Sequence, residues 1–220
     1  MPKKKRLPPS RMKKSRDNGT KPAVLSRKAH GLPFSRLKAE AKARALEWGR
    51  DRVSEHFDAD RLTEDLKGYV KEKHGLDAGD CYWKLGHCQG DGVAFYGVID
   101  LDPLKQAQPE VAAIFARLRL LGIQSCTLDA HIEGANSHYH HYNSMDVRVE
   151  VLDYEPEHEA QAEQAGEDLQ KFLDDFLKDV SRDAERYGYE VIDGETSDEH
   201  VQEFIEANEY RFKRDGTFAK

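Results

Sequence analysis

The chain has 220 residues, of which 38% are hydrophobic and 34% are charged. This length is enough for one sizeable core, but the composition is polar for a globular domain, so we expect part of the chain to stay unpacked. No apolar run approaches the roughly 20 residues that a membrane-spanning helix needs, and no signal peptide is recognisable. We therefore expect no membrane partner.

Cysteine usage favours a reducing compartment. The chain contains Cys81, Cys88 and Cys126, an odd number without a short Cys-x-x-Cys spacing. Such a set is atypical of the disulfide frameworks that small secreted domains use. Together with the absence of a recognisable export signal, it predicts an intracellular protein that is not exported.

The net charge of −7 conceals two oppositely charged parts. Residues 1–50 contain 16 Lys or Arg and three acids, whereas the other 170 residues contain 18 Lys or Arg and 38 acids. Residues 1–33 also contain five prolines and few large apolar side chains, so they cannot offset the entropy lost on ordering. We predict a disordered basic tail at residues 1–33 and a single domain at residues 34–220.

A tail of this charge density is typical of segments that bind nucleic acid by releasing counterions from phosphates. A solvated tail that makes no specific contact is the alternative interpretation. The run Pro2–Arg6 also has the form of a nuclear import signal, a pattern that is common by chance. The tail residues that we expect to contact phosphates are Lys3, Lys4, Lys5, Arg6, Lys13 and Lys14.

Apolar residues at helical spacing predict two helices in the first part of the domain. The first begins at Ser35, a suitable N-cap, and runs to about His56. The second spans residues 59–73 and is ended by Gly75.

The centre of the chain has the composition of β-strands. Residues 81–88 and 93–101 are rich in aromatic and β-branched side chains and flank the turn Gln89–Gly92. The Asp-Gly pair in this turn is a strong hairpin signal, because both positions tolerate positive φ angles. A helix is predicted next, from about Pro103 to Gly122.

A second pair of strands is predicted at residues 123–134 and 139–153, where apolar and charged residues alternate near the end. The last third of the chain is predicted to be helical. Thr196 and Glu199 form a capping box for a short helix, and the tail from Tyr210 has room for one edge strand. An apolar stripe at helical spacing comprises Leu169, Phe172, Leu173, Phe176, Leu177 and Val180.

The order of helices, strands and helices predicts an α+β fold. In it, an antiparallel sheet of about four strands packs against N- and C-terminal helices. One face of each strand pair would contact the helices and the other would face water or a ligand.

Two loops between predicted strands are rich in polar side chains that can bind ligands or transfer protons. The first contains Gln89 and Asp91, and the second, at Ser137–Asn143, contains His138 and His141. Imidazoles near a carboxylate suit either partner binding or acid–base chemistry. We therefore predict that Gln89, Asp91, His138 and His141 form a binding site.

An enzymatic interpretation is the alternative. A small metal-assisted hydrolase or nuclease would use His138, His141 and Asp91, but the spacing matches no known metal signature, so we expect neither a metal nor a cofactor. No Walker-type loop, nucleophile elbow or His-Glu-x-x-His motif is found. A non-enzymatic binding protein is therefore the favoured interpretation.

Four motifs make the chain similar to a family of small phage and prophage proteins that carry the label "antitoxin of toxin–antitoxin stability system". The similarity covers residues 35–215, and Cys88 stands where the family has a serine, which argues against a nucleophile there. The motifs are Ala41-Lys42-Ala43-Arg44-Ala45-Leu46-Glu47-Trp48, Cys88-Gln89-Gly90-Asp91-Gly92-Val93-Ala94-Phe95-Tyr96-Gly97, His138-Tyr139-His140-His141 and Glu203-Phe204-Ile205-Glu206-Ala207-Asn208-Glu209-Tyr210-Arg211-Phe212.

The resemblance implies a mobile-element origin and a cytoplasmic setting. We expect a phage- or prophage-type binding protein, antitoxin-like or host-modulating, that recognises a host protein, a toxin or a nucleic acid. The resemblance brings no catalytic residues with it. The basic tail lies outside the matched range, so a nucleic-acid role for the tail rests on its charge alone.

Overall fold

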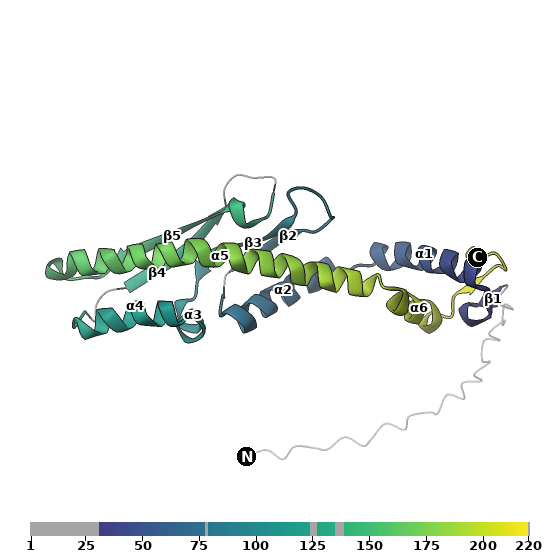
Figure 1. Ribbon diagram of the computed structural model, residues 1–220, viewed down its shortest axis with the longest axis horizontal. Coiled ribbons are helices and arrows are strands. Elements are labelled where there is room, and N and C mark those ends of the chain that lie inside the picture. Colours follow the sequence, from purple (N-terminus) through teal and green to yellow (C-terminus); the bar gives the residue numbers. More distant parts are fainter. Residues whose placement is uncertain (1–30, 78, 124–126, 135–138, 220) are drawn as a thin grey trace, which may run out of the picture.

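Within residues 31–77, 79–123, 127–134 and 139–219, which the computed structural model describes, the chain forms an elongated α+β fold around a four-stranded antiparallel sheet (Figure 1). The predicted fold class is confirmed. The α-helices are α1 (Ala39–Glu55), α2 (Ala59–His74), α3 (Leu101–Ala107), α4 (Pro109–Leu120), α5 (Glu159–Glu195) and α6 (Asp198–Ala207). The strands are β1 (Leu32–Pro33), β2 (Asp80–Lys84), β3 (Gly92–Ile99), β4 (Thr127–Gly134), β5 (Met145–Leu152) and β6 (Arg211–Phe212). Short 3-10 turns are η1 (Phe34–Arg36), η2 (Tyr142–Ser144) and η3 (Pro156–His158).

The main sheet is a meander in the order β2-β3-β4-β5, with every neighbouring pair antiparallel. Its two faces follow the alternation of the sequence. Ala130 pairs with Val149 and Ile132 with Val147 on the inner face, whereas His131 pairs with Arg148 on the outer face. Because alternate side chains point to opposite sides, the inner face is apolar and the outer face is polar.

Helix α5 covers the inner face of the sheet, with α2 and α4 beside it (Figure 1). The predicted apolar stripe is confirmed: Leu169, Leu173, Leu177 and Val180 are fully or almost fully buried. The helix has 37 residues and is therefore about 55 Å long. Its hydrophobic stripe is continuous for most of that length, which lets one helix contact both the sheet and the loops at its edge.

A second hydrophobic cluster lies at the opposite end of the molecule from β4 and α4 (Figure 1). Helices α1 and α6 pack together there, and β6 pairs with β1, which confirms the edge strand predicted near the C-terminus. The Trp48 ring stacks on Phe218 with centroids 4.4 Å apart. The buried residues of this second cluster are Phe34, Leu37, Ala41, Ala45, Val53, Val201, Ile205 and Phe212.

Several predicted boundaries were wrong for local reasons. Ser35 lies in the 3-10 turn η1, and α1 begins after Lys38 instead. Thr196 is the C-cap of α5, whereas Ser197 caps α6 by accepting the His200 N–H. The helix predicted from Pro103 to Gly122 is divided at Gln108, whose extended backbone ends α3 and begins α4.

The strand limits differ as well. β2 ends at Lys84 rather than at residue 88, because His87 has a φ of +56° and Gly90 a φ of +91°, which the extended conformation excludes. The predicted tight turn at Gln89–Gly92 is therefore part of a longer loop that connects Lys84 to Gly92. Likewise, β5 begins at Met145 rather than at residue 139, so His140 and His141 lie in a loop and not on a strand.

Most of the predicted tail, residues 1–30, lies outside the described residues, and with it the proposed phosphate contacts Lys3, Lys4, Lys5, Arg6, Lys13 and Lys14. Its predicted end at residue 33 was wrong, because Leu32 and Pro33 form β1. In the described part of the chain, none of the helices combines the length and apolarity that a membrane crossing requires.

Candidate functional site

The loop between β2 and β3 and the segment 139–144 before β5 pack directly on each other. A Cβ atom on Gly90 would lie 2.5 Å from a ring carbon of Tyr139, and one on Gly92 would lie 2.6 Å from the Cβ of His141. Both glycines therefore permit close approach, in addition to the turn geometry that the sequence indicated. The Gln-Gly-Asp-Gly loop and the segment Tyr139–His141 are therefore two halves of one interlocked structure.

Together the two loops enclose an open pocket of about 560 Å³, which we call the loop pocket. It brings together three of the four predicted binding residues, Gln89, Asp91 and His141. His138 lies outside the described residues. The described residues that line the pocket are Gln89, Gly90, Asp91, Tyr139, His141, Tyr142 and Asn143.

Asp91 is buried, and it holds the first loop together. Its Oδ2 atom accepts hydrogen bonds from the backbone N–H groups of Gly86 (2.6 Å) and Cys88 (2.7 Å) and from the hydroxyl of Tyr189 (2.8 Å). Burial alone would raise the pKa of Asp91, but these three donors outweigh it and lower the pKa. Its other oxygen, Oδ1, is buried and has no hydrogen-bond partner in the described part of the chain. Asp91 is thus a structural anion rather than an available base.

His141 is fixed in orientation by its own loop. Its Nδ1 atom accepts the backbone N–H of Asn143 at 3.0 Å, and its backbone N–H donates to Ser144 Oγ at 3.0 Å. A neutral imidazole whose Nδ1 accepts a hydrogen bond carries its proton on Nε2. In this tautomer, the Nε2–H group of His141 is a hydrogen-bond donor that neither of these two hydrogen bonds uses.

Aromatic rings surround the two loops. The His141 ring is near those of Tyr139 (centroids 6.1 Å apart) and Tyr142 (5.6 Å). On the outer face of the sheet, Tyr82 stacks on His140 at 5.4 Å. Tyr82 and Tyr139 are each 47% exposed.

Helix α5 supplies residues that sequence reasoning missed. Tyr189 binds Asp91, and its ring stacks on His87 with centroids 4.4 Å apart. Arg182 lies 4.4 Å from the ring centre of Tyr142 and donates a hydrogen bond to its hydroxyl, which lowers the pKa of that phenol. Helical spacing shows that Arg182 and Tyr189 share a face, but not which loop packs there.

Glu185 lies on the same face of α5, between these two residues in sequence. Its partial burial raises its pKa, the nearby charge of Asp91 raises it further, and His141 partly opposes both effects. Perturbed carboxyl groups of this kind are concentrated at functional sites, although structural charge clusters also produce them. Glu185 does not line the loop pocket, but it lies on the face of α5 whose Arg182 and Tyr189 contact the pocket residues Tyr142 and Asp91.

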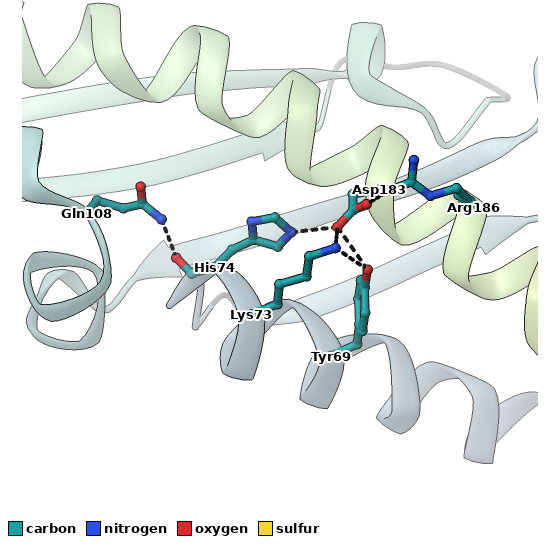
Figure 2. A network of polar contacts seen from close by, with 6 residues as sticks. All are labelled: Tyr69, Lys73, His74, Gln108, Asp183 and Arg186. Carbon is teal, nitrogen blue, oxygen red and sulfur yellow. Dashed lines mark hydrogen bonds and ion pairs between the residues drawn. The ribbon is translucent and has the colours of Figure 1, made fainter.

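A second polar network joins α2 to α5 and was not anticipated (Figure 2). The Oδ2 atom of Asp183, a nearly buried residue, contacts the Tyr69 hydroxyl (2.9 Å), Lys73 Nζ (2.6 Å) and His74 Nε2 (2.8 Å). Arg186 pairs with the other oxygen. Burial opposes ionisation of Asp183, but the bonds from Lys73, His74 and Tyr69 prevail and hold its pKa well below the ordinary value.

This network also reaches the start of α4. The Gln108 side chain donates to the backbone carbonyl of His74 at 2.9 Å, and the Tyr69 ring stacks on Tyr187 with centroids 4.1 Å apart (Figure 2 shows the polar part). With four partners on one carboxylate, the arrangement is suited to clamping helices rather than to chemistry.

The described residues contain no group of three or more His, Cys, Asp or Glu side chains placed to hold a metal ion.

Residues 53–198 match a protein family described as a domain of unknown function (DUF8835). The matched range includes both loops of the pocket and the whole Asp183 network, but not β1, β6 or the basic tail. No curated protein and no solved structure matches the chain.

Proposed function

The chain belongs to the DUF8835 family, whose function is unknown. From the geometry of the site, we propose that the protein is a non-enzymatic binding protein that holds a single-stranded nucleic acid at the loop pocket. One observation carries this proposal. The exposed ring of Tyr139 meets the side chains of Gln89 and His141 at the pocket, while the pocket carboxylate, Asp91, is already engaged by three donors. That combination favours recognition over catalysis.

The charge distribution supports phosphate binding by the basic tail rather than by the folded body. Residues 1–30 contain 11 Lys or Arg and one acid, whereas residues 31–220 contain 23 Lys or Arg and 40 acids. An acidic body repels a phosphate backbone, so the attraction has to come from the basic tail. We propose a division of roles in which the tail attracts the strand and the loop pocket contacts its bases.

The resemblance of residues 35–215 to phage and prophage proteins supports a cytoplasmic setting and an antitoxin-like or host-modulating role. A nucleic acid that belongs to the host or to a toxin system is compatible with that setting. Binding to a host or toxin protein is the competing interpretation, and it predicts no affinity for nucleic acid.

Fluorescence anisotropy with short labelled single-stranded RNA and DNA tests the proposal. We expect binding by the full chain at low salt, with log affinity falling linearly with log salt concentration. Replacing the tail residues with Gln should make the plot of log affinity against log salt concentration less steep, by about 0.7 in slope for each phosphate that the tail no longer neutralises. The residues to replace are Lys3, Lys4, Lys5, Arg6, Lys13 and Lys14. Failure of the full chain to bind either strand at low salt would reject the proposal.

A hydrolase or nuclease is a second candidate, favoured by the position of Glu185 on the face of α5 whose Arg182 and Tyr189 contact the pocket residues Tyr142 and Asp91. The pKa of Glu185 is also raised. Incubating the same labelled strands with Mg²⁺, Mn²⁺ or Zn²⁺ tests it. Cleavage that is lost in both Glu185→Gln and His141→Ala would support an enzyme, and intact strands under all three conditions would exclude nuclease activity with these metals.

A further inference from the structure

The loop pocket has the chemistry of a site for one particular kind of base. Resting on the nucleic-acid function proposed above, we propose that it takes a single unpaired uracil or thymine, stacked on Tyr139 and read by Gln89 and His141. Stacking, hydrogen bonding and charge each favour such a base.

The Tyr139 ring is a prepared stacking surface. The ring packs against Gly90, where even a Cβ atom would come within 2.5 Å of a ring carbon, and about half of the side chain (47%) is exposed. A ring held in place by its own backbone support loses little freedom when a base stacks on it. The open pocket of about 560 Å³ next to this ring has room for a base and part of its sugar.

The polar groups match an imide edge. The Gln89 amide offers a donor and an acceptor and has no hydrogen-bond partner among the residues that the structure describes, and the Nε2–H of His141 is a second donor. Two donors and one acceptor complement two carbonyl oxygens flanking an N–H group, which is the Watson–Crick edge of uracil and thymine. Adenine presents one donor and one acceptor there and leaves a protein donor unpaired, which is costly on burial.

Charge favours a neutral ligand. Among the described residues that line the pocket, Asp91 is the one acid, and Glu185 lies close to it on α5. These carboxyl groups disfavour a phosphate in the pocket itself. A guanidinium ligand needs an accessible carboxylate, but Asp91 Oδ2 already accepts three hydrogen bonds and Oδ1 is buried. A neutral planar base avoids both problems.

The test compares labelled oligouridylate, oligoadenylate and an abasic strand of equal length, each titrated with the full chain. We expect the order uridylate, adenylate, abasic, with Tyr139→Ala weakening uridylate binding by roughly 5- to 150-fold and Tyr139→Phe retaining it. Gln89→Ala should remove the preference for uridylate, whereas Gln202→Ala, an exposed glutamine of α6, should not. Thermal melts of each variant verify folding.

The outcomes separate the two proposals. Equal affinity for all three strands, unchanged in the Tyr139 and Gln89 variants, would overturn the base pocket and leave a nucleic-acid function that rests on the tail. No binding of any strand at low salt would overturn both. If free arginine, but not uridine, perturbs the NMR signals of His141, the pocket recognises a cationic side chain and the base assignment is wrong.

Discussion

The hydroxyl of Tyr189 donates a 2.8 Å hydrogen bond to Asp91 across 98 positions of the sequence. This contact ties the long helix α5 to the loop that carries the Gln-Gly-Asp-Gly motif. Because Asp91 also binds two backbone N–H groups of its own loop, a single carboxylate fixes both the loop shape and its position against the helix.

Tyr189→Phe removes this donor while keeping the ring. We expect a loss of about 1.5–3 kcal/mol in the free energy of unfolding, since the hydrogen bond that is removed is to a charged, buried acceptor. Urea denaturation measures the change. Tyr154→Phe serves as the control, because the described residues offer the Tyr154 hydroxyl no hydrogen bond. An equal effect in both variants would contradict a specific role for the Tyr189–Asp91 bond.

Asp183→Asn removes the charge that holds Tyr69, Lys73, His74 and Arg186 together (Figure 2). We expect the free energy of unfolding to fall by about 2 kcal/mol, less than for a fully buried ion pair because the cationic partners remain partly in water. Asp179→Asn, one turn earlier on α5 in an exposed pair with Arg182, should cost at most about 0.5 kcal/mol. Urea denaturation curves of both variants measure the two changes in unfolding free energy, and equal changes would contradict a special role for Asp183.

Stability should depend on pH through the same carboxylate. The pKa of Asp183 is lowered in the folded protein, so its contribution is present above the unfolded Asp value of about 3.9 and is lost as the pH falls toward the folded pKa. The difference in unfolding free energy between wild type and Asp183→Asn should thus be constant near neutral pH and shrink below about pH 4. A difference that stays constant in acid would rule out an electrostatic clamp.

Gly90→Ala should disrupt the packing of the two loops. The added methyl group meets the Tyr139 ring, and the residue has a φ of +91°, which favours glycine. We expect a destabilisation of about 1–3 kcal/mol and increased hydrogen exchange in both loops. Gly68→Ala is the matched control: it faces open space on α2 and should stabilise the protein by about 0.5–1 kcal/mol.

The two described cysteines should differ in reactivity. Burial raises the pKa of Cys81 to about 12, whereas Cys88 is exposed on the first loop. Because the thiolate is the reactive form, iodoacetamide should modify Cys88 in the native protein and Cys81 only after unfolding. Peptide-resolved mass spectrometry measures this directly, and rapid native labelling of Cys81 would show that strand β2 does not bury this thiol.

The sequence alone was sufficient for features that depend on local spacing. The apolar stripe of α5 follows from residues three and four apart, and Gly75 ends α2 because it adopts a φ of +73°. The α+β class follows from the order of such segments along the chain. The loops at Gln89–Asp91 and His138–His141 were identified by composition, since turn residues and imidazoles are dense there.

Only the tertiary structure decided which of these side chains meet and what each one does. Asp91 is engaged by Tyr189, the imidazole of His141 is oriented by the backbone of Asn143, and Asp183 gathers partners from a helix more than a hundred residues earlier. Periodicity defines the face of a helix or strand, but the register between distant elements depends on how their surfaces interlock. Gly90 beneath Tyr139 shows the difference: the turn is encoded locally, whereas the need for an empty Cβ position arises from a ring 49 residues away.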